Sequence, residues 1–218
     1  MTIRRGEDWG RVGRPPVDLP WFDDDDTAAE AYRRGERAIG VRGGDLARTL
    51  GVRQGGTTDV TSMSDRPVES VSFPIDVIEL TCSDGRRTVA LAHVVVRSRR
   101  WGWWRGPITV LMNAQYIGRW DVAPRSHPND GRVDLLEVEP TMSIRQRFLA
   151  GRRLPIGSHV PHPLVRTRSV ARTTFVVPAS ARVDVDGHPW IDGSSTTEST
   201  IAAEIVPDAL EVWIPGVR

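Results

Sequence analysis

The sequence contains no lysine, because all 29 of its basic residues are arginine. Lysine is the residue that a Walker-type phosphate loop places on nucleotide phosphates, and it is also the residue that forms Schiff bases. Both chemistries are therefore excluded for this chain. The basic residues are balanced by 28 acidic ones, so the formal net charge is +1. A nucleic-acid-binding domain usually has a strong basic excess, and we expect no nucleic-acid partner.

Cysteine and long apolar runs are also scarce. Cys82 is the one cysteine among 218 residues, which rules out an internal disulfide and fits a reducing compartment. No run of about 18 apolar residues occurs, so we expect no membrane span. The first residues lack the apolar stretch of a secretory signal. A cytoplasmic location is therefore expected.

Apolar periodicity and turn signals predict a mainly β (α+β) fold. Short helices are expected at residues 27–34 and 45–50, with Thr27 and Glu30 forming a capping box, Asp45 as an N-cap and Gly51 as a stop. Asp84-Gly85 between apolar runs is typical of a β-hairpin. Many short strands separated by turns favour a β-sandwich. The strands are expected at residues 38–41, 75–81, 88–96, 108–113, 133–138, 164–170, 173–177, 182–185, 201–206 and 210–214.

The organisation along the chain predicts two parts. Residues 1–60 are expected to be an N-terminal segment with short helices, and residues 61–218 a β-sandwich domain. Residues 52–65 are rich in Gly, Thr and Ser and are expected to be a linker. One late helix is expected at residues 143–150, with Ile144, Phe148 and Leu149 on one face and Gly151 at its end.

Several short motifs occur in a fixed order. Residues 43–51 read GGDLARTLG, and residues 113–118 read NAQYIG and are followed by the turn Asp130-Gly131. Residues 183–188 read VDVDGH, and residues 206–212 read VPDALEV. In this order they resemble the G-T-G-N-D-x-A-R-x-L-G, N-x-x-x-x-G, D-G-x-L-D, D-G-E and P-x-A-L-x-V motifs of the diacylglycerol kinase and related bacterial lipid kinase family. The order and spacing across residues 40–215 carry the resemblance.

The resemblance implies that most of the chain corresponds to the family's back domain. That domain is a β-sandwich, and it presents a lipid-binding side and a catalytic base to a front α/β domain that holds ATP. The family's front domain has a Gly-Gly-Asp-Gly phosphate turn, and the sequence shows nothing like it. Arg42 and Gly44 also replace a Thr and an Asn of the family loop, so Gly43, Gly44 and Asp45 are no reliable nucleotide site. Because phosphoryl transfer depends on positioned phosphates, we do not expect this chain to bind ATP by itself.

A magnesium site is implied residue by residue. Asp130 falls on the family's magnesium-binding aspartate, with the backbone carbonyls of His127 and Arg132 at the other ligand positions. Carboxylate and carbonyl oxygens suit a hard cation. The residues alone, read as Asn129-Asp130-Gly131, are typical of a turn, and both interpretations stay open.

Two catalytic candidates are implied in the same way. Asp186 falls on the aspartate of the D-G-E motif. His188 replaces the family's catalytic glutamate, which takes a proton from the lipid hydroxyl. Histidine is able to act as a general base near neutral pH, so the replacement leaves the chemistry open. The alternative is a hairpin residue after an Asp-Gly turn.

Trp101, Trp103, Trp104 and Arg105 form an unusual local cluster. Tryptophan and arginine are enriched at lipid headgroup boundaries and at protein interfaces, so these residues are a candidate partner or lipid surface. Packing within their own domain is the third interpretation.

Three functions follow from these observations. The first is a lipid-kinase-like domain that is not an active kinase alone and binds a lipid or a protein partner. The second is a genuine lipid kinase that acts with a separate ATP-binding subunit. The third is a structural interaction module. We expect either a homo-oligomer or a complex with a separate chain, because the surface that the family packs against its front domain needs a cover.

Overall fold

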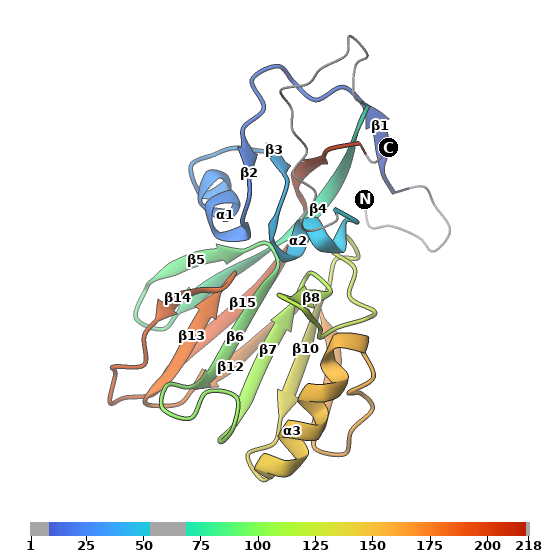
Figure 1. Ribbon diagram of the computed structural model, residues 1–218. Coiled ribbons are helices and arrows are strands. Elements are labelled where there is room, and N and C mark those ends of the chain that lie inside the picture. Colours follow the sequence, from blue (N-terminus) through green and yellow to red (C-terminus); the bar gives the residue numbers. More distant parts are fainter. Residues whose placement is uncertain (1–8, 53–68, 217–218) are drawn as a thin grey trace.

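Two long antiparallel strands, β4 (Ser70–Cys82) and β15 (Ser199–Ile214), run through both parts of the molecule (Figure 1). The computed structural model describes residues 9–52 and 69–216. The pairing register of the two strands shifts between Val206 and Leu210, where Asp208 has a φ of 51°. Such an irregularity bends a strand and increases its twist. β15 pairs with β4 on both sides of the shift, with β12 before it and with β3 after it, although two separate strands were predicted here.

Two sheets form the predicted sandwich. Sheet A has the order β1-β4-β15-β3-β2, with β12 on β15 and β5 on β4, and sheet B has the order β11-β10-β7-β6-β13-β14. Inward side chains such as Ile78, Val94 and Leu135 form the core between them. The mainly β fold with a small α-containing N-terminal segment is therefore confirmed. The shorter strands are β1 (Arg11–Gly13), β5 (Arg87–Ala90), β6 (His93–Ser98), β7 (Ile108–Met112), β8 (Tyr116–Ile117), β9 (Trp120–Asp121), β10 (Val133–Val138), β11 (Val165–Val170), β12 (Arg172–Val177), β13 (Ala181–Val185) and β14 (His188–Ile191).

The N-terminal segment is a small α/β unit that packs on the β4–β15 pair (Figure 1). It consists of β2 (Trp21–Phe22), α1 (Asp25–Arg33), β3 (Ala38–Val41) and α2 (Gly44–Thr49). β2 and β3 are parallel, and β3 is also parallel to the end of β15. Ala28, Ile39 and Leu46 share a core with Ile75 and Leu210. The expected boundary between the two parts, near residue 60, lies outside the described residues, as does most of the expected linker.

The helix starts differ from the sequence predictions. α1 begins two residues earlier than expected, because Asp24 is its N-cap and accepts a 2.8 Å hydrogen bond from the Thr27 N–H. The expected capping box at Thr27 is therefore wrong, and Glu30 instead pairs with Arg34 at 3.1 Å. The N-cap of α2 is Gly43, so the N-cap prediction for Asp45 is also wrong.

The predicted strand at residues 88–96 is two strands. β5 ends at Ala90 and β6 begins at His93. The backbone N–H groups of Leu91, Ala92 and His93 donate to the carboxylate of Asp186, far away in sequence. A tertiary contact therefore interrupts the ladder, which no local signal could reveal.

The outer face of sheet B carries a third apolar cluster. Val95, Val110, Met112 and Leu136 point outward from β6, β7 and β10, opposite to the inward Val94. Loops and two helical segments, α3 (Ile144–Arg153) and a 3₁₀ turn at Leu154–Ile156, lie over this face. α3 starts with a capping box between Ser143 and Gln146 and runs through Gly151, which was expected to end it. Among the described residues, no helix is both long and apolar enough to cross a bilayer.

Candidate functional site

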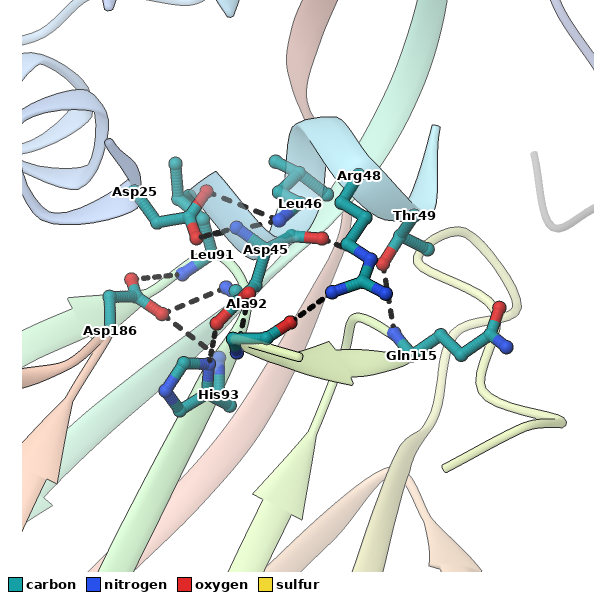
Figure 2. Close-up of polar contacts among 11 residues, drawn as sticks. Asp25, Asp45, Leu46, Arg48, Thr49, Leu91, Ala92, His93, Gln115 and Asp186 are labelled. Carbon is teal, nitrogen blue, oxygen red and sulfur yellow. Dashed lines mark hydrogen bonds and ion pairs between the residues drawn. The ribbon is translucent and has the colours of Figure 1, made fainter. Parts of the chain in front are cut away.

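Asp186 occupies the tight turn between β13 and β14. It has a φ of 47° and Gly187 a φ of 86°, as two-residue hairpin turns require. The buried carboxylate accepts hydrogen bonds of 2.8–2.9 Å from the N–H groups of Leu91, Ala92 and His93 (Figure 2). The turn thus fixes this carboxylate under the N-terminal α/β unit.

A second buried carboxylate, that of Asp25, lies at the start of α2 (Figure 2). Its oxygens accept hydrogen bonds from the Asp45 N–H at 2.6 Å and the Leu46 N–H at 3.2 Å. A Cβ on Gly44 would lie 2.4 Å from this carboxylate, and a Cβ on Gly43 would lie 2.3 Å from the Asp23 carbonyl. The two glycines therefore allow the β2–α1 turn to approach α2 closely. The N–H groups of the first turn of α2, which have no partner within the helix, thus donate to the Asp25 carboxyl group.

Asp45 connects α2 to the sandwich. Its carboxylate accepts a 2.8 Å hydrogen bond from the Gly118 N–H and lies 3.6 Å from Nδ1 of His93. Arg48, one turn later, donates to the Gly118 carbonyl and stacks over the ring of Tyr116. Thr49 accepts a 3.0 Å hydrogen bond from the Gln115 N–H. These contacts hold α2 against β8 and β6 (Figure 2).

The electrostatics of this site are dominated by burial of like charges. Burial raises the pKa of Asp186 to about 6, although three N–H bonds oppose the shift. Burial, and next the charge of Asp186, raises the pKa of Asp25 well above its usual range. Burial also raises the pKa of Asp45 and lowers the pKa of His93. We call Asp25, Asp45, Asp186 and His93 the carboxylate cluster.

The structure brings five of the sequence-predicted site residues to the same region. Asp45 and Asp186 belong to the carboxylate cluster, and Gly43 and Gly44 lie beside Asp25. His188 is exposed on β14, with Nδ1 3.6 Å from the Asp26 carboxylate. The loop at residues 43–45, which the sequence analysis gives as no reliable nucleotide site, therefore lies near the turn that carries Asp186, although the two are far apart in sequence.

Asp130, the predicted magnesium ligand, lies in a separate turn before β10. One carboxylate oxygen accepts a 2.9 Å hydrogen bond from the Arg132 N–H. Burial raises its pKa to about 6, and the charges of Asp134 and Asp76 add to that shift. The ring of His127 packs against that of Trp9, with ring centroids 4.3 Å apart and the planes tilted by 52°. Within residues 9–52 and 69–216, no three His, Cys, Asp or Glu side chains are grouped to hold a metal ion.

The tryptophan cluster lies in the loop between β6 and β7. Trp103 packs inside the domain, edge-on to Trp120 at 5.4 Å. Trp101 and Trp104 remain 45% and 50% exposed. Arg100 and Arg105 both lie over the ring of Trp101. Of the residues predicted as a partner or lipid surface, Trp101, Trp104 and Arg105 are therefore exposed, and Trp103 is packed inside the domain.

A cavity of about 580 Å³ opens beside the outer face of sheet B. Val122, Leu136 and Val160 form part of its apolar wall, and Arg125 and Arg168 also line it. Asp134 lines the cavity as well, so its polar lining carries both signs of charge. The cavity was not anticipated from the sequence, because its lining comes from segments whose proximity depends on tertiary packing.

Two site features were missed by sequence reasoning. Asp25 belongs to the run of four aspartates at residues 23–26, and it alone among them is buried. His93 was interpreted only as a strand residue. The local sequence does contain a signal for Asp25. A strand, an acidic turn and a helix follow one another before the Gly43-Gly44 loop, and this order could have drawn attention to the turn.

Comparisons with known proteins complete this description. No protein-family model and no curated protein matches the sequence. Among solved structures, the chain is similar to a diacylglycerol kinase from Bacillus anthracis str. Sterne, with 13% identity and a TM-score of 0.42 over 80% of this chain and 66% of that chain. It is also similar to yeast NADH kinase complexed with NADH, with 9% identity and a TM-score of 0.44 over 68% of this chain and 45% of that chain.

Proposed function

We propose that this chain is a lipid-kinase-like domain that does not bind ATP by itself and that binds a lipid or a protein partner. One observation supports the claim that the chain does not bind ATP by itself. At the start of α2, the N–H groups of Asp45 and Leu46 donate to the Asp25 carboxylate. Donors of this kind are what a phosphate group needs from a loop and a helix start.

The charges around this position also oppose a nucleotide. Asp23, Asp24 and Asp26 flank the buried Asp25, and Asp45 and Asp186 lie on the opposite side. Arg48 is engaged with the Gly118 carbonyl and the Tyr116 ring. Phosphoryl transfer relies on cations and free donors to neutralise phosphate charge. The residues present therefore do not fit a bound ATP.

An assay of lipid phosphorylation tests whether the chain uses ATP by itself. The purified chain is incubated with diacylglycerol, ATP and magnesium, and we expect no phosphatidic acid above the protein-free control. Product formation that disappears in the Asp186→Ala variant would overturn the proposal.

The cavity beside sheet B supports a lipid as the ligand. Its apolar wall suits an acyl chain, and Arg125 and Arg168 suit a phosphate or carboxylate. We expect a soluble, short-chain phosphatidic acid to bind with saturation. Thr167 is an exposed residue that lines the cavity, and Thr167→Trp should lower the affinity roughly tenfold by filling it. The exposed Thr174 on β12 gives a matched control, and an equal loss in Thr174→Trp would contradict the assignment.

One observation favours the second candidate, a lipid kinase that is completed by a separate ATP-binding subunit. His188 is exposed and has the Asp26 carboxylate 3.6 Å from Nδ1, so a carboxylate lies where it would orient an accessible imidazole. Asp186 would then act as a positioning residue through the β13–β14 turn. Activity that appears only when a nucleotide-binding chain is added, and that is lost in His188→Gln, would support this candidate.

A magnesium ion at Asp130 is part of the same proposal. One Asp130 oxygen accepts the Arg132 N–H, and its other oxygen has no hydrogen-bond partner among the described residues. The resemblance places the backbone carbonyls of His127 and Arg132 at the other ligand positions, and oxygen donors suit a hard cation. Calorimetric titration should show magnesium binding that Asp130→Asn removes, and identical heats for both proteins would contradict it. The expected homo-oligomer or separate partner chain stays a prediction that light scattering tests on the same preparation.

A further inference from the structure

α3 is turned opposite to the usual arrangement of a helix on a protein surface. A surface helix normally buries its apolar side chains and exposes its charged ones. In α3, Arg147 is buried, whereas Ile144, Phe148 and Leu149 are 46%, 52% and 46% exposed. The apolar face that the sequence predicts therefore points to solvent.

Arg147 holds the helix in this orientation. Its guanidinium donates to the backbone carbonyls of Met142, Trp103, Gly106 and Glu139. Two of these carbonyls belong to the loop between β6 and β7, which carries the exposed Trp101 and Trp104. α3 and this loop are thus fastened together, and Figure 1 shows both at the end of the molecule away from α1 and α2.

Exposed arginines surround these apolar side chains. The loop at residues 99–106 and the helical segment at residues 144–156 contain no acidic residue. The exposed arginines of the two segments are Arg99, Arg100, Arg105, Arg145, Arg152 and Arg153. We call Trp101, Trp104, Ile144, Phe148, Leu149 and these arginines the exposed patch.

We propose that the exposed patch docks on the surface of a bilayer that contains anionic phospholipid. Indole rings and aliphatic side chains enter the headgroup boundary, and arginines pair with the phosphates of anionic lipids. The acidic residues 23–26 lie in the N-terminal unit at the other end of the molecule, so an anionic membrane orients the chain with the patch toward it (Figure 1).

The charge of the patch argues against a second copy of this chain as the occupant. A two-fold symmetric interface places the same surface on both partners, so each arginine group would face its own copy. Like charges across an interface are unfavourable. An anionic surface, in contrast, complements all of the arginines at once.

This inference rests on the lipid part of the proposed function and extends it. Ile156, at the end of the 3₁₀ turn, is 76% exposed and precedes Gly157, which lines the cavity. Docking through the patch would therefore bring the cavity close to the membrane from which a lipid enters. The soluble-lipid test of the cavity and the vesicle test of the patch use different residues, so either is able to fail without the other.

The test is cosedimentation of the purified chain with two kinds of vesicle. One kind is phosphatidylcholine alone, and the other is phosphatidylcholine mixed with phosphatidylglycerol. We expect binding to the mixed vesicles that weakens as salt is raised. The Trp101→Ala, Trp104→Ala double variant should bind roughly tenfold more weakly, since indoles give much of the interfacial affinity. Removing Arg145 and Arg152 together by Gln should cost at least about tenfold, from about fivefold per arginine.

Matched controls lie at other sites. Val12 on β1 is 67% exposed, and Val12→Gln should leave vesicle binding unchanged. The control Arg33→Gln, Arg87→Gln also removes two positive charges, but outside the patch. Because salt screens charges that lie far from the membrane, vesicle binding should weaken by less than about twofold. No binding to either vesicle, equal binding to both, or equal loss in control and patch variants would overturn the proposal. A dimer that the Trp101→Ala, Trp104→Ala variant disperses, without vesicle binding, would also overturn it and assign the patch to a second copy.

Discussion

Within the N-terminal unit, Asp25 joins the turn between β2 and α1 to the start of α2. Its carboxylate satisfies the Asp45 and Leu46 N–H groups in a buried position. Asp25→Ala leaves both donors without a partner, and a buried unsatisfied donor costs about 1–3 kcal/mol. We expect the free energy of unfolding to fall by that amount in denaturant titration. Asp23 is exposed, so Asp23→Ala should change stability by less than about 0.5 kcal/mol; equal effects of the two variants would contradict the role of Asp25.

Asp186 should give the fold an unusual dependence on pH. Its pKa is about 6 in the folded chain, above its ordinary value of 3.8, so the folded chain binds more protons than the unfolded chain between these values. Its contribution to stability is therefore complete below pH 3.8 and is lost as the pH rises through about 6. Asp25 and Asp45 are shifted in the same direction, whereas the lowered pKa of His93 acts in the opposite sense.

Comparison with a neutral variant isolates the Asp186 contribution. Asp186→Asn should be destabilised overall, because its amide nitrogen faces an N–H donor. The wild-type advantage should be larger near pH 5 than near pH 8 by roughly 1.4 kcal/mol, from the shift of Asp186. Denaturant unfolding of both proteins across this range gives the difference. An advantage that grows toward alkaline pH would show that the Asp186 pKa is lowered instead.

At the scale of elements, local signals identified most strands and missed the contacts that interrupt or orient them. The Asp84-Gly85 hairpin between β4 and β5 is confirmed, because its turn chemistry is local. The gap between β5 and β6 depends on Asp186, and the outward orientation of α3 depends on Arg147. Both effects come from residues distant in sequence, and periodicity alone carries no information about them. The same reason explains why Asp130 and Asp186 were picked out only through a family resemblance.

Arg147 is the element-scale test of how α3 is held. Its buried guanidinium has four carbonyl partners and no carboxylate partner among the described residues. Arg147→Met keeps much of the side-chain volume and removes these bonds, so we expect about 2 kcal/mol of lost stability. Hydrogen exchange of α3 amides should also accelerate. Arg145 is exposed on the same helix, and Arg145→Met should change neither quantity; similar exchange in both variants would contradict the anchoring role.

At the scale of the whole molecule, the two ends of the chain have different characters. The end with α1 and α2 carries the acidic run at residues 23–26, and the carboxylate cluster joins its helices to the sandwich. The other end exposes the patch of tryptophan, aliphatic and arginine side chains, next to the cavity. This arrangement is what the proposed lipid-directed function without a nucleotide site requires. Whole-molecule polarity of this kind was not predictable, because it depends on which charges of a nearly neutral chain are brought together by folding.

Calorimetric titration of the purified chain with ATP and magnesium tests the central claim most directly. The measurement includes a variant in which Asp23, Asp24 and Asp26 are replaced by Asn, which removes three negative charges while Asp25 stays in place. We predict no saturable binding to the wild-type chain. The variant should also fail to bind, because Asp25 still accepts the N–H groups at the start of α2. Saturable binding of ATP by the wild-type chain, weakened by Asp186→Ala, would contradict the account.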